Sequence, residues 1–191
     1  AWLVDQLRGM TNAGVEDYTV GADTYWSNSH LQNVLDRYAV FVRDEPLVSA
    51  QVMETGGAAS YDYQSRYKFF EASDGGTLRF TLKDGTGALV SSSNWTADYN
   101  NGRVTFSTDQ AGAVYYLTGT SFDVYAAAAD VWYQKAAQAA DKIDFSTDGH
   151  NIKRSHLVDT AIKMAQRFEG MADHPVGASN SSAETVRGDL Q

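Results

Sequence analysis

The sequence predicts an α+β protein in which the N-terminal and C-terminal parts form a helical bundle and an antiparallel β section is inserted between them. Two changes in the spacing of apolar residues predict this division. In residues 1–46 and 120–172 the apolar residues recur at three- and four-residue steps, as on one face of a helix. In residues 47–119 they alternate with polar residues, as in half-buried antiparallel strands. We expect residues 173–191 to form a flexible tail, because they contain almost nothing to bury.

The N-terminal part is expected to contain two helices separated by a loop. The first, over residues 2–10, is short and needs tertiary contacts to be stable. Glycine and asparagine in residues 11–26 indicate the loop. The second helix is expected to begin at Ser29, which forms a capping box with Gln32, and to end before Pro46. The inner faces of the two helices are expected to contain Trp2, Leu3, Leu7 and Met10, and Leu31, Val34, Leu35, Tyr38 and Val42.

The central section is expected to be a meander of antiparallel strands. Leu78, Phe80 and Leu82 alternate with polar residues, which is the period of a strand with one buried face. Asn101-Gly102 separates two strand-like runs and predicts a hairpin with a type I′ turn. A further strand is expected over residues 114–117.

The strongest pattern lies in residues 121–143, where a seam of apolar residues predicts a long helix, capped by Thr120 or Ser121. The apolar band is wide, roughly 160° on a helical wheel, and a polar face opposes it. Two interpretations remain open: a monomeric helical core, or a helix that packs in its own subunit and also touches a neighbouring copy. A last helix follows Ser155, with one apolar stripe. The residues expected at the packing and oligomer interface are Phe122, Tyr125, Ala127, Val131, Trp132, Ala136 and Phe168.

Residues that could carry chemistry do not form a catalytic or metal-binding motif. The histidines His30, His150, His156 and His174 include no pair at the spacing of a helical zinc site. Residues 144–149 resemble the opening of a calcium-binding EF-hand loop, but the twelfth position is Ser155, where calcium needs a bidentate carboxylate. Cysteine is absent, so there is no thiol nucleophile. We expect no cofactor and no enzymatic activity; a small hydrolase that uses Asp or Glu with His150 is one alternative.

The charge and hydropathy of the chain exclude several further classes. The formal net charge is −9 and the sequence pI is about 4.7, so binding nucleic acid is not expected to be its main task. No apolar run approaches the length of a membrane span, and we expect no membrane contact. Residues 1–10 contain Asp5 in their apolar part and no preceding basic region, so we expect no signal peptide.

Aromatic residues of the β section allow a second function. On a sheet they could line a groove for a carbohydrate or a peptide, which gives the alternative of a β-rich glycan- or protein-binding module of a virion or surface structure. Packing between neighbouring strands explains the same residues more simply. The residues concerned are Tyr61, Tyr63, Tyr67, Trp95, Tyr99, Tyr115 and Tyr116.

Five short motifs lie outside residues 47–118. They are LQNVLD in residues 31–36, GTSFDVYAA in residues 119–127, FSTDG in residues 145–149, Arg154-Ser155, and MAQRF in residues 164–168. In this order the chain resembles the head–tail connector, or adaptor, proteins of long-tailed bacteriophages. In that family, short N-terminal helices precede a variable or β section, an alanine-rich helix follows, and a loop leads to a last helix. The length of the β section departs from the compact members of the family.

The resemblance implies a structural protein of the virion neck, assembled in the host cytoplasm. It implies a ring, usually of twelve copies, that contacts the portal protein and a tail-side neck or tail-terminator protein and lines the DNA exit channel. A head-to-tail contact that closes on itself makes such a ring, and a negative lumen lets DNA pass without sequence-specific binding. The tail would become ordered on the portal. The docking residues expected in it are Val176, Val186, Arg187 and Leu190.

Overall fold

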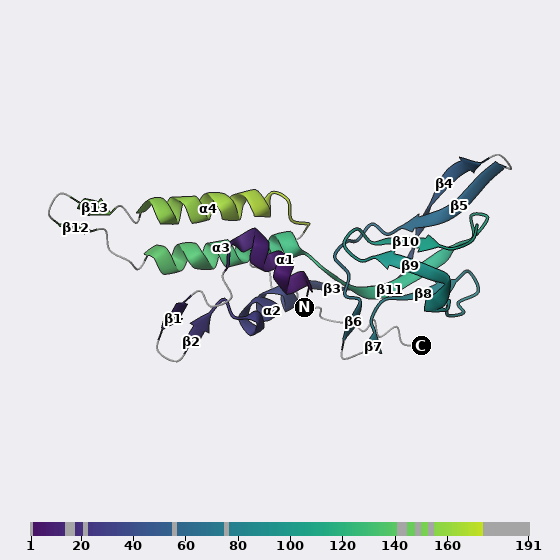
Figure 1. The fold of residues 1–191 in the computed structure, drawn as a ribbon, viewed down its shortest axis with the longest axis horizontal. Coiled ribbons are helices and arrows are strands. Elements are labelled where there is room, and N and C mark those ends of the chain that lie inside the picture. Colours follow the sequence, from purple (N-terminus) through teal and green to yellow (C-terminus); the bar gives the residue numbers. More distant parts are fainter. Residues whose placement is uncertain are drawn as a thin grey trace, which may run out of the picture.

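The computed structural model describes residues 2–13, 18–20, 23–54, 57–74, 77–140, 145–147, 150–152 and 155–173. Helices gather at one end of an elongated molecule and most strands at the other (Figure 1). Two long strands, β3 (Ala39–Pro46) and β11 (Tyr115–Phe122), lead from one group to the other (Figure 1). We call the two groups the helical module and the β module.

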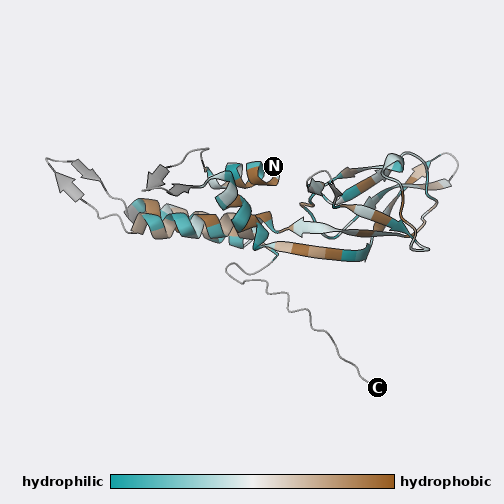
Figure 2. Cartoon of the chain, turned by 90° about the horizontal axis from the view of Figure 1, so that it is seen from below, coloured by the Kyte–Doolittle hydropathy of each residue, from teal (hydrophilic) through white to brown (hydrophobic). Residues whose placement is uncertain are grey.

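The helical module is built around one central helix. Its helices are α1 (Trp2–Thr11), α2 (Asn28–Asp36), α3 (Val124–Ala140) and α4 (Ser155–Glu169). α4 packs along α3, and both α1 and α2 also contact α3. Apolar and polar residues alternate along these helices, as expected for helices that bury one face (Figure 2). The module also contains the short hairpins β1 (Tyr18–Val20) with β2 (Asp23–Tyr25) and β12 (Phe145–Thr147) with β13 (His150–Ile152).

The β module consists of two antiparallel sheets with a shared aromatic core. One sheet has the order β4 (Val48–Glu54), β5 (Gly57–Gln64), β10 (Arg103–Phe106) and β9 (Trp95–Asp98), and the other has the order β3, β11 and β8 (Thr81–Asp84). Tyr63 of the first sheet meets Tyr115 of the second edge to face, with ring centroids 5.1 Å apart. Such pairs stabilise a core beyond the area they bury. The module also contains the hairpin β6 (Ser73–Asp74) with β7 (Thr77–Leu78) and the 3-10 turn η1 (Ser92–Asn94).

The predicted fold class is wrong in how it divides the chain between helices and strands. The β module is not an insertion confined to residues 47–119, because β3 comes from the segment predicted as the second helix and β11 extends into the segment predicted as the third. The chain is of α+β type, with a β-rich central region. Val42 explains the error: it continues the helical spacing of Leu31, Leu35 and Tyr38, but it is buried in the β module while they are buried in the helical module.

The predicted helix caps are also wrong. The N-cap of α2 is Ser27, two residues before the expected Ser29, and its hydroxyl accepts a hydrogen bond from the His30 amide at 3.2 Å. The helix ends at Asp36, ten residues before the predicted stop at Pro46. For α3 the capping side chain is Asp123, whose Oδ1 accepts from the Ala126 amide at 2.9 Å. The predicted caps Thr120 and Ser121 lie in β11 instead.

The hairpin predicted around Asn101-Gly102 and the loop predicted over residues 11–26 have different outcomes. The expected hairpin around Asn101-Gly102 is confirmed as β9 and β10, but the type I′ turn is wrong. Pairing closes between Asp98 and Arg103, which leaves a four-residue loop, and Gly102 has a positive φ of 65° whereas Asn101 does not. The Asp98 carboxylate holds the loop by accepting from the amides of Asn100 and Asn101. The loop expected over residues 11–26 contains the β1–β2 hairpin.

Candidate functional site

The first half of α3 is almost entirely buried. Ala126, Ala127, Ala128, Ala129 and Val131 are fully buried. α4 covers one side of α3, and α1 and α2 cover another, so this helix lies between partners from its own chain. Alanine leaves little side chain at each contact, so the neighbouring helices approach closely.

Polar residues of α3, on the face opposite the apolar band, contact α2 and the two residues that follow it. Asp130 accepts a hydrogen bond from the Tyr38 hydroxyl at 3.0 Å and pairs with Arg37 at 3.1 Å. Gln134 donates to the same carboxylate at 3.0 Å, and its oxygen lies 3.2 Å from His30 Nε2. The network joins α3 to α2. It also pairs polar groups near the core, where an unpaired polar group would destabilise the fold.

The end of α1 is held by two further side chains of α3. The Lys135 ammonium donates to the carbonyl oxygens of Thr11 and Asn12, at 2.9 and 3.3 Å, and therefore caps the helix C-terminus. It also lies 5.2 Å from the centre of the Trp132 ring, a cation–π contact. Trp132 donates its indole N–H to the Met10 carbonyl at 3.2 Å. Trp132, one of the residues expected at the packing and oligomer interface, therefore anchors α1 to α3 within the subunit.

The residues predicted at an oligomer interface lie mainly inside the subunit. Ala127 and Val131, two of these residues, are fully buried under helices of the same chain. Phe122 and Ala136 are buried as well, whereas Tyr125, Trp132 and Phe168 are partly exposed. The open alternative, a monomeric helical core, accounts for the burial of Ala127 and Val131. Contact between copies would have to use other surfaces.

Asp123 connects the start of α3 to the end of α4. Besides capping α3, its carboxylate accepts from the Asp173 amide through Oδ2 at 2.8 Å. The residues on either side, Phe122 and Val124, are buried in the helical core. Gly119 lies in β11 where an added Cβ would come within 3.2 Å of the Phe70 ring. The sequence motif in residues 119–127 is thus a set of packing and capping residues at the junction of the two modules.

A cavity of about 220 Å³ lies at this junction. Tyr67, Tyr125 and Met171 are among the residues that line it. Its polar groups serve the fold, since the Ser121 hydroxyl donates to the Lys68 carbonyl at 2.6 Å and the Asp123 carboxylate binds two backbone amides. The lining contains no histidine.

The candidate chemical residues do not gather in one place. Within the described ranges, no three or more His, Asp or Glu residues are grouped so that they could hold a metal ion. His156 is exposed near the start of α4, and His30 belongs to the α2–α3 network. The backbone of His150 lies in β13. Several candidates lie outside the described residues: His174, the predicted docking residues of the tail, the side chains of His150 and Ser155, and most of the EF-hand-like segment.

The aromatic residues of the β module are mostly core residues. Trp95, Tyr63 and Tyr115 are buried, and the Trp95 ring lies 5.7 Å from that of Phe80. Tyr99 is partly exposed but packs edge to face on Phe80 at 5.2 Å. Packing between strands and sheets therefore explains this cluster, and the described side chains of Trp95 and Tyr99 do not form an exposed platform for a sugar.

Exposed apolar residues instead gather on β3 and β4. Phe41 of β3 and Val48 of β4 are 68% and 70% exposed, and Val52 and Met53 of β4 are exposed as well. A groove of about 390 Å³ lies beside Phe41 and Val48. The groove is lined by Phe41, Val42, Arg43, Asp44, Glu45, Pro46, Val48, Arg66 and Tyr67.

Two arginines and two carboxylates line this groove, and the arginines are the more exposed. The Arg43 and Arg66 side chains are 79% and 76% exposed, while their partners Asp44 and Glu45 are 42% and 8% exposed. Arg66 pairs with Glu45 at 3.2 Å, and the Ser65 hydroxyl donates to the same carboxylate at 2.8 Å. Each arginine of the groove is therefore more exposed than the carboxylate with which it pairs.

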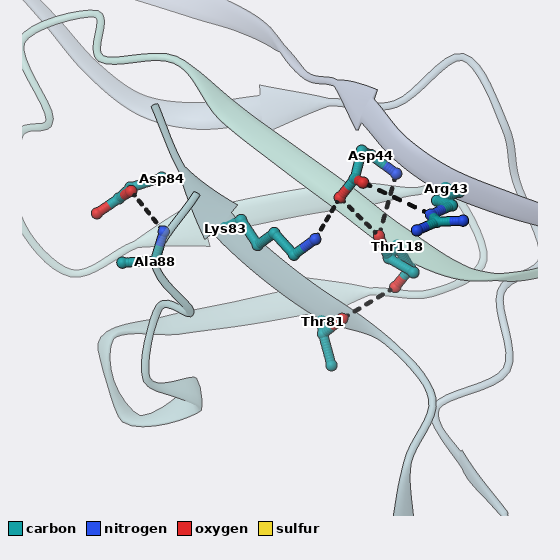
Figure 3. A network of polar contacts seen from close by, with 7 residues as sticks. All are labelled: Arg43, Asp44, Thr81, Lys83, Asp84, Ala88 and Thr118. Carbon is teal, nitrogen blue, oxygen red and sulfur yellow. Dashed lines mark hydrogen bonds and ion pairs between the residues drawn. The ribbon is translucent and has the colours of Figure 1, made fainter. Parts of the chain in front are cut away.

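A β-bulge determines where Arg43 and Asp44 point. These two residues of β3 oppose the single residue Thr118 of β11, and Asp44 has a positive φ of 47°. Its carboxylate pairs with Lys83 of β8 at 2.7 Å and accepts from Thr118, so the interactions span all three strands (Figure 3). The hydrogen bond from Lys83 lowers the pKa of Asp44.

The sequence interpretation missed this surface. Phe41, Arg43 and Val48 lie in or next to a segment that was assigned to a helix, so they were not compared as neighbours on two strands. The signal that could have found them is the run VFVRDEPLV in residues 40–48, in which three valines and a phenylalanine favour a strand and Pro46 is typical of an edge strand.

Comparisons with known proteins do not assign this chain to a family. No protein-family model matches the chain, and no curated protein matches it either. None of the helices in the described part of the chain combines the length and the apolar character needed to cross a bilayer.

Proposed function

We propose that this protein is a structural component of the neck of a tailed bacteriophage, where it forms a ring between the portal and the tail. The observation that carries the proposal is the role of the motifs behind the family resemblance. Residues 119–127 build the strand-to-helix junction around Asp123, and residues 164–168 lie on α4, where Ala165 is buried. Both motifs therefore contribute packing contacts rather than chemistry, as expected for a protein whose task is assembly.

The shape and the charge are compatible with this function. The two modules at opposite ends of the molecule give one chain two distinct surfaces, as needed to contact one neighbour above and another below (Figure 1). The negative net charge would repel the phosphate backbone of DNA passing through the ring, so that the DNA does not bind to its wall. The proposed partners are further copies of the chain, the portal protein, and a tail-side neck or tail-terminator protein.

Electron microscopy of the full chain tests the proposal directly. The protein is imaged in negative stain alone and after mixing with a phage portal protein purified from the same source. We expect rings with a central hole, either free or seated on the portal. A preparation that shows neither rings nor a complex with the portal contradicts the proposal.

A truncation tests the role of the tail in docking. Deleting residues 176–191 removes Val176, Val186, Arg187 and Leu190, and is expected to weaken binding to the portal at least tenfold, about 1.4 kcal/mol. The urea midpoint of unfolding is expected to stay unchanged, because the residues described up to Asp173 contain both cores. Equal portal affinity of the truncated and full chains contradicts the docking role.

A further inference from the structure

The β module has two opposite sides that differ in character. On one side, β3 and β4 are the outer strands of their sheets, and they follow one another in the chain through Leu47 alone. On the other side are β8 and β9, which lie close together because Phe80 next to β8 packs on Trp95 of β9. We call them the β3–β4 side and the β8–β9 side.

The β3–β4 side has free backbone edges and exposed apolar residues. In the described part of the chain, no strand pairs with the outer edge of β3 or of β4. Proteins usually protect such edges, because unpaired N–H and C=O groups invite another strand. Here the edges carry Phe41, Val48, Val52 and Met53, all exposed, and the groove beside the first two presents Arg43 to solvent. Such a surface is typical of a protein interface.

The β8–β9 side is complementary in charge and also presents an exposed apolar residue. The chain turns back after Asp84, and residues 88–90 cover the outer edge of β8 through hydrogen bonds between Val90 and Leu82 and between Asp84 and Ala88. Leu89 on this segment is 73% exposed.

The acidic groups of the β8–β9 side are ionised. Hydrogen bonds from Thr86 lower the pKa of Asp84, and a hydrogen bond from Asn101 lowers the pKa of Asp98 at the end of β9. Lys83, the lysine of β8, is already paired with Asp44. This side therefore presents carboxylates and an apolar residue, whereas the β3–β4 side presents arginines and apolar residues.

We infer that the β3–β4 side of one copy binds the β8–β9 side of the next copy. The contact joins two different surfaces, so it repeats head to tail and closes into a ring when the rotation between copies allows it. Apolar residues would provide the affinity, and the opposite charges would fix the orientation. This inference rests on the proposed function, because it locates the contact through which the ring would close. The inferred contact uses exposed residues that a neighbouring copy can reach, in place of the buried Ala127 and Val131 that were expected at the interface.

Thiol cross-linking tests the contact, since the chain contains no cysteine and gives no background. The full chain with both Val48→Cys and Leu89→Cys is treated with a short bis-maleimide, alone and after mixing with the portal protein. We expect a ladder of dimers, trimers and larger species on a denaturing gel. The matched control carries Val48→Cys with Lys163→Cys, which is exposed on α4, and should give no such ladder.

A charge reversal tests the electrostatic part. Adding Arg43→Glu to the Val48→Cys, Leu89→Cys chain is expected to lower the yield of the ladder several-fold, while adding Lys163→Glu, the same change of charge on α4, should leave it unchanged. The contact is wrong if the double-cysteine chain gives no ladder, if the control pair gives an equal one, or if Val48→Cys alone gives dimers as the main product. It is also wrong if the two charge reversals act alike.

The outcomes separate this inference from the proposed function. Rings or portal complexes in the microscope without the cross-linked ladder would refute the contact and leave the neck function standing. A ladder without rings and without portal binding would establish the contact and refute the neck function.

Discussion

The carboxylate of Asp123 provides the sharpest test of how the helical module is held together. It accepts from the Ala126 amide at the start of α3 and from the Asp173 amide after α4. Asp123→Ala removes a helix cap, which costs about 1 kcal/mol. It also removes a second charged hydrogen bond, whose loss adds about 1 kcal/mol because Asp173 is exposed and water can replace the acceptor. We expect a total loss of about 2 kcal/mol, or about 4–8 °C in Tm for a chain of this size.

A conservative variant separates the two parts of this effect. Asparagine caps helices as well as aspartate does, but its amide nitrogen cannot accept a hydrogen bond from Asp173. Asp123→Asn should therefore lose about 1 kcal/mol, about half the effect of alanine. Asp159→Ala, an exposed change on α4, is the control and should stay within about 0.5 kcal/mol of the unmodified chain.

The assay is urea unfolding followed by both far-ultraviolet circular dichroism and tryptophan fluorescence, because a chain with two cores can unfold in more than one step. The reasoning is refuted if Asp123→Ala costs no more than Asp159→Ala. It is also refuted in part if the asparagine and alanine variants are equally unstable, since Asp173 would then add nothing to the role of Asp123.

Three further predictions concern single residues. Trp132→Ala should cost about 2–3 kcal/mol in urea unfolding, less than for a fully buried tryptophan because the side chain is partly exposed; a loss within the range of a surface substitution would contradict its anchor role. Gly102→Ala should destabilise the β module by about 3 kcal/mol or more, because a Cβ would collide with the Tyr67 carbonyl and the residue has a positive φ; a near-native melting temperature would contradict this. Hydrogen bonds from Arg103 and Thr105 lower the pKa of Asp62, so its stabilising effect is present above about pH 4 and is lost as the pH falls through the lowered pKa. For each protein, the free energy of unfolding at pH 3 is compared with its own value at pH 5. Asp62→Asn should lose less stability between these pH values than the unmodified chain does. An equal loss in the two proteins would contradict the stabilising role of the Asp62 carboxylate.

The burial of α3 within its own chain has a general consequence for interpreting alanine-rich helices. A wide apolar band on α3 requires two packing partners, and the band alone does not reveal whether both belong to the same chain. Here α4 supplies one partner and α1 with α2 supply the other. The exposed apolar residues that we propose as the contact with another copy lie on the β module: Phe41 on β3, Val48 on β4, and Leu89 in the segment that follows β8.

Local patterns in the sequence determined the elements whose residues interact over short distances. The spacing of apolar residues predicted α1, α3 and α4, and the Asn101-Gly102 pair predicted the β9–β10 hairpin, because helical and strand periods follow from backbone geometry alone. The tertiary structure decided the rest. Residues 39–46 are a strand because β11 supplies pairing partners 70 or more residues away in the chain. Asp130 faces the end of α2 because Arg37 and Tyr38, the two residues after that helix, pair with it. At these positions long-range pairing outweighs local preference. The periodicity of one segment does not show which distant segment will pair with it.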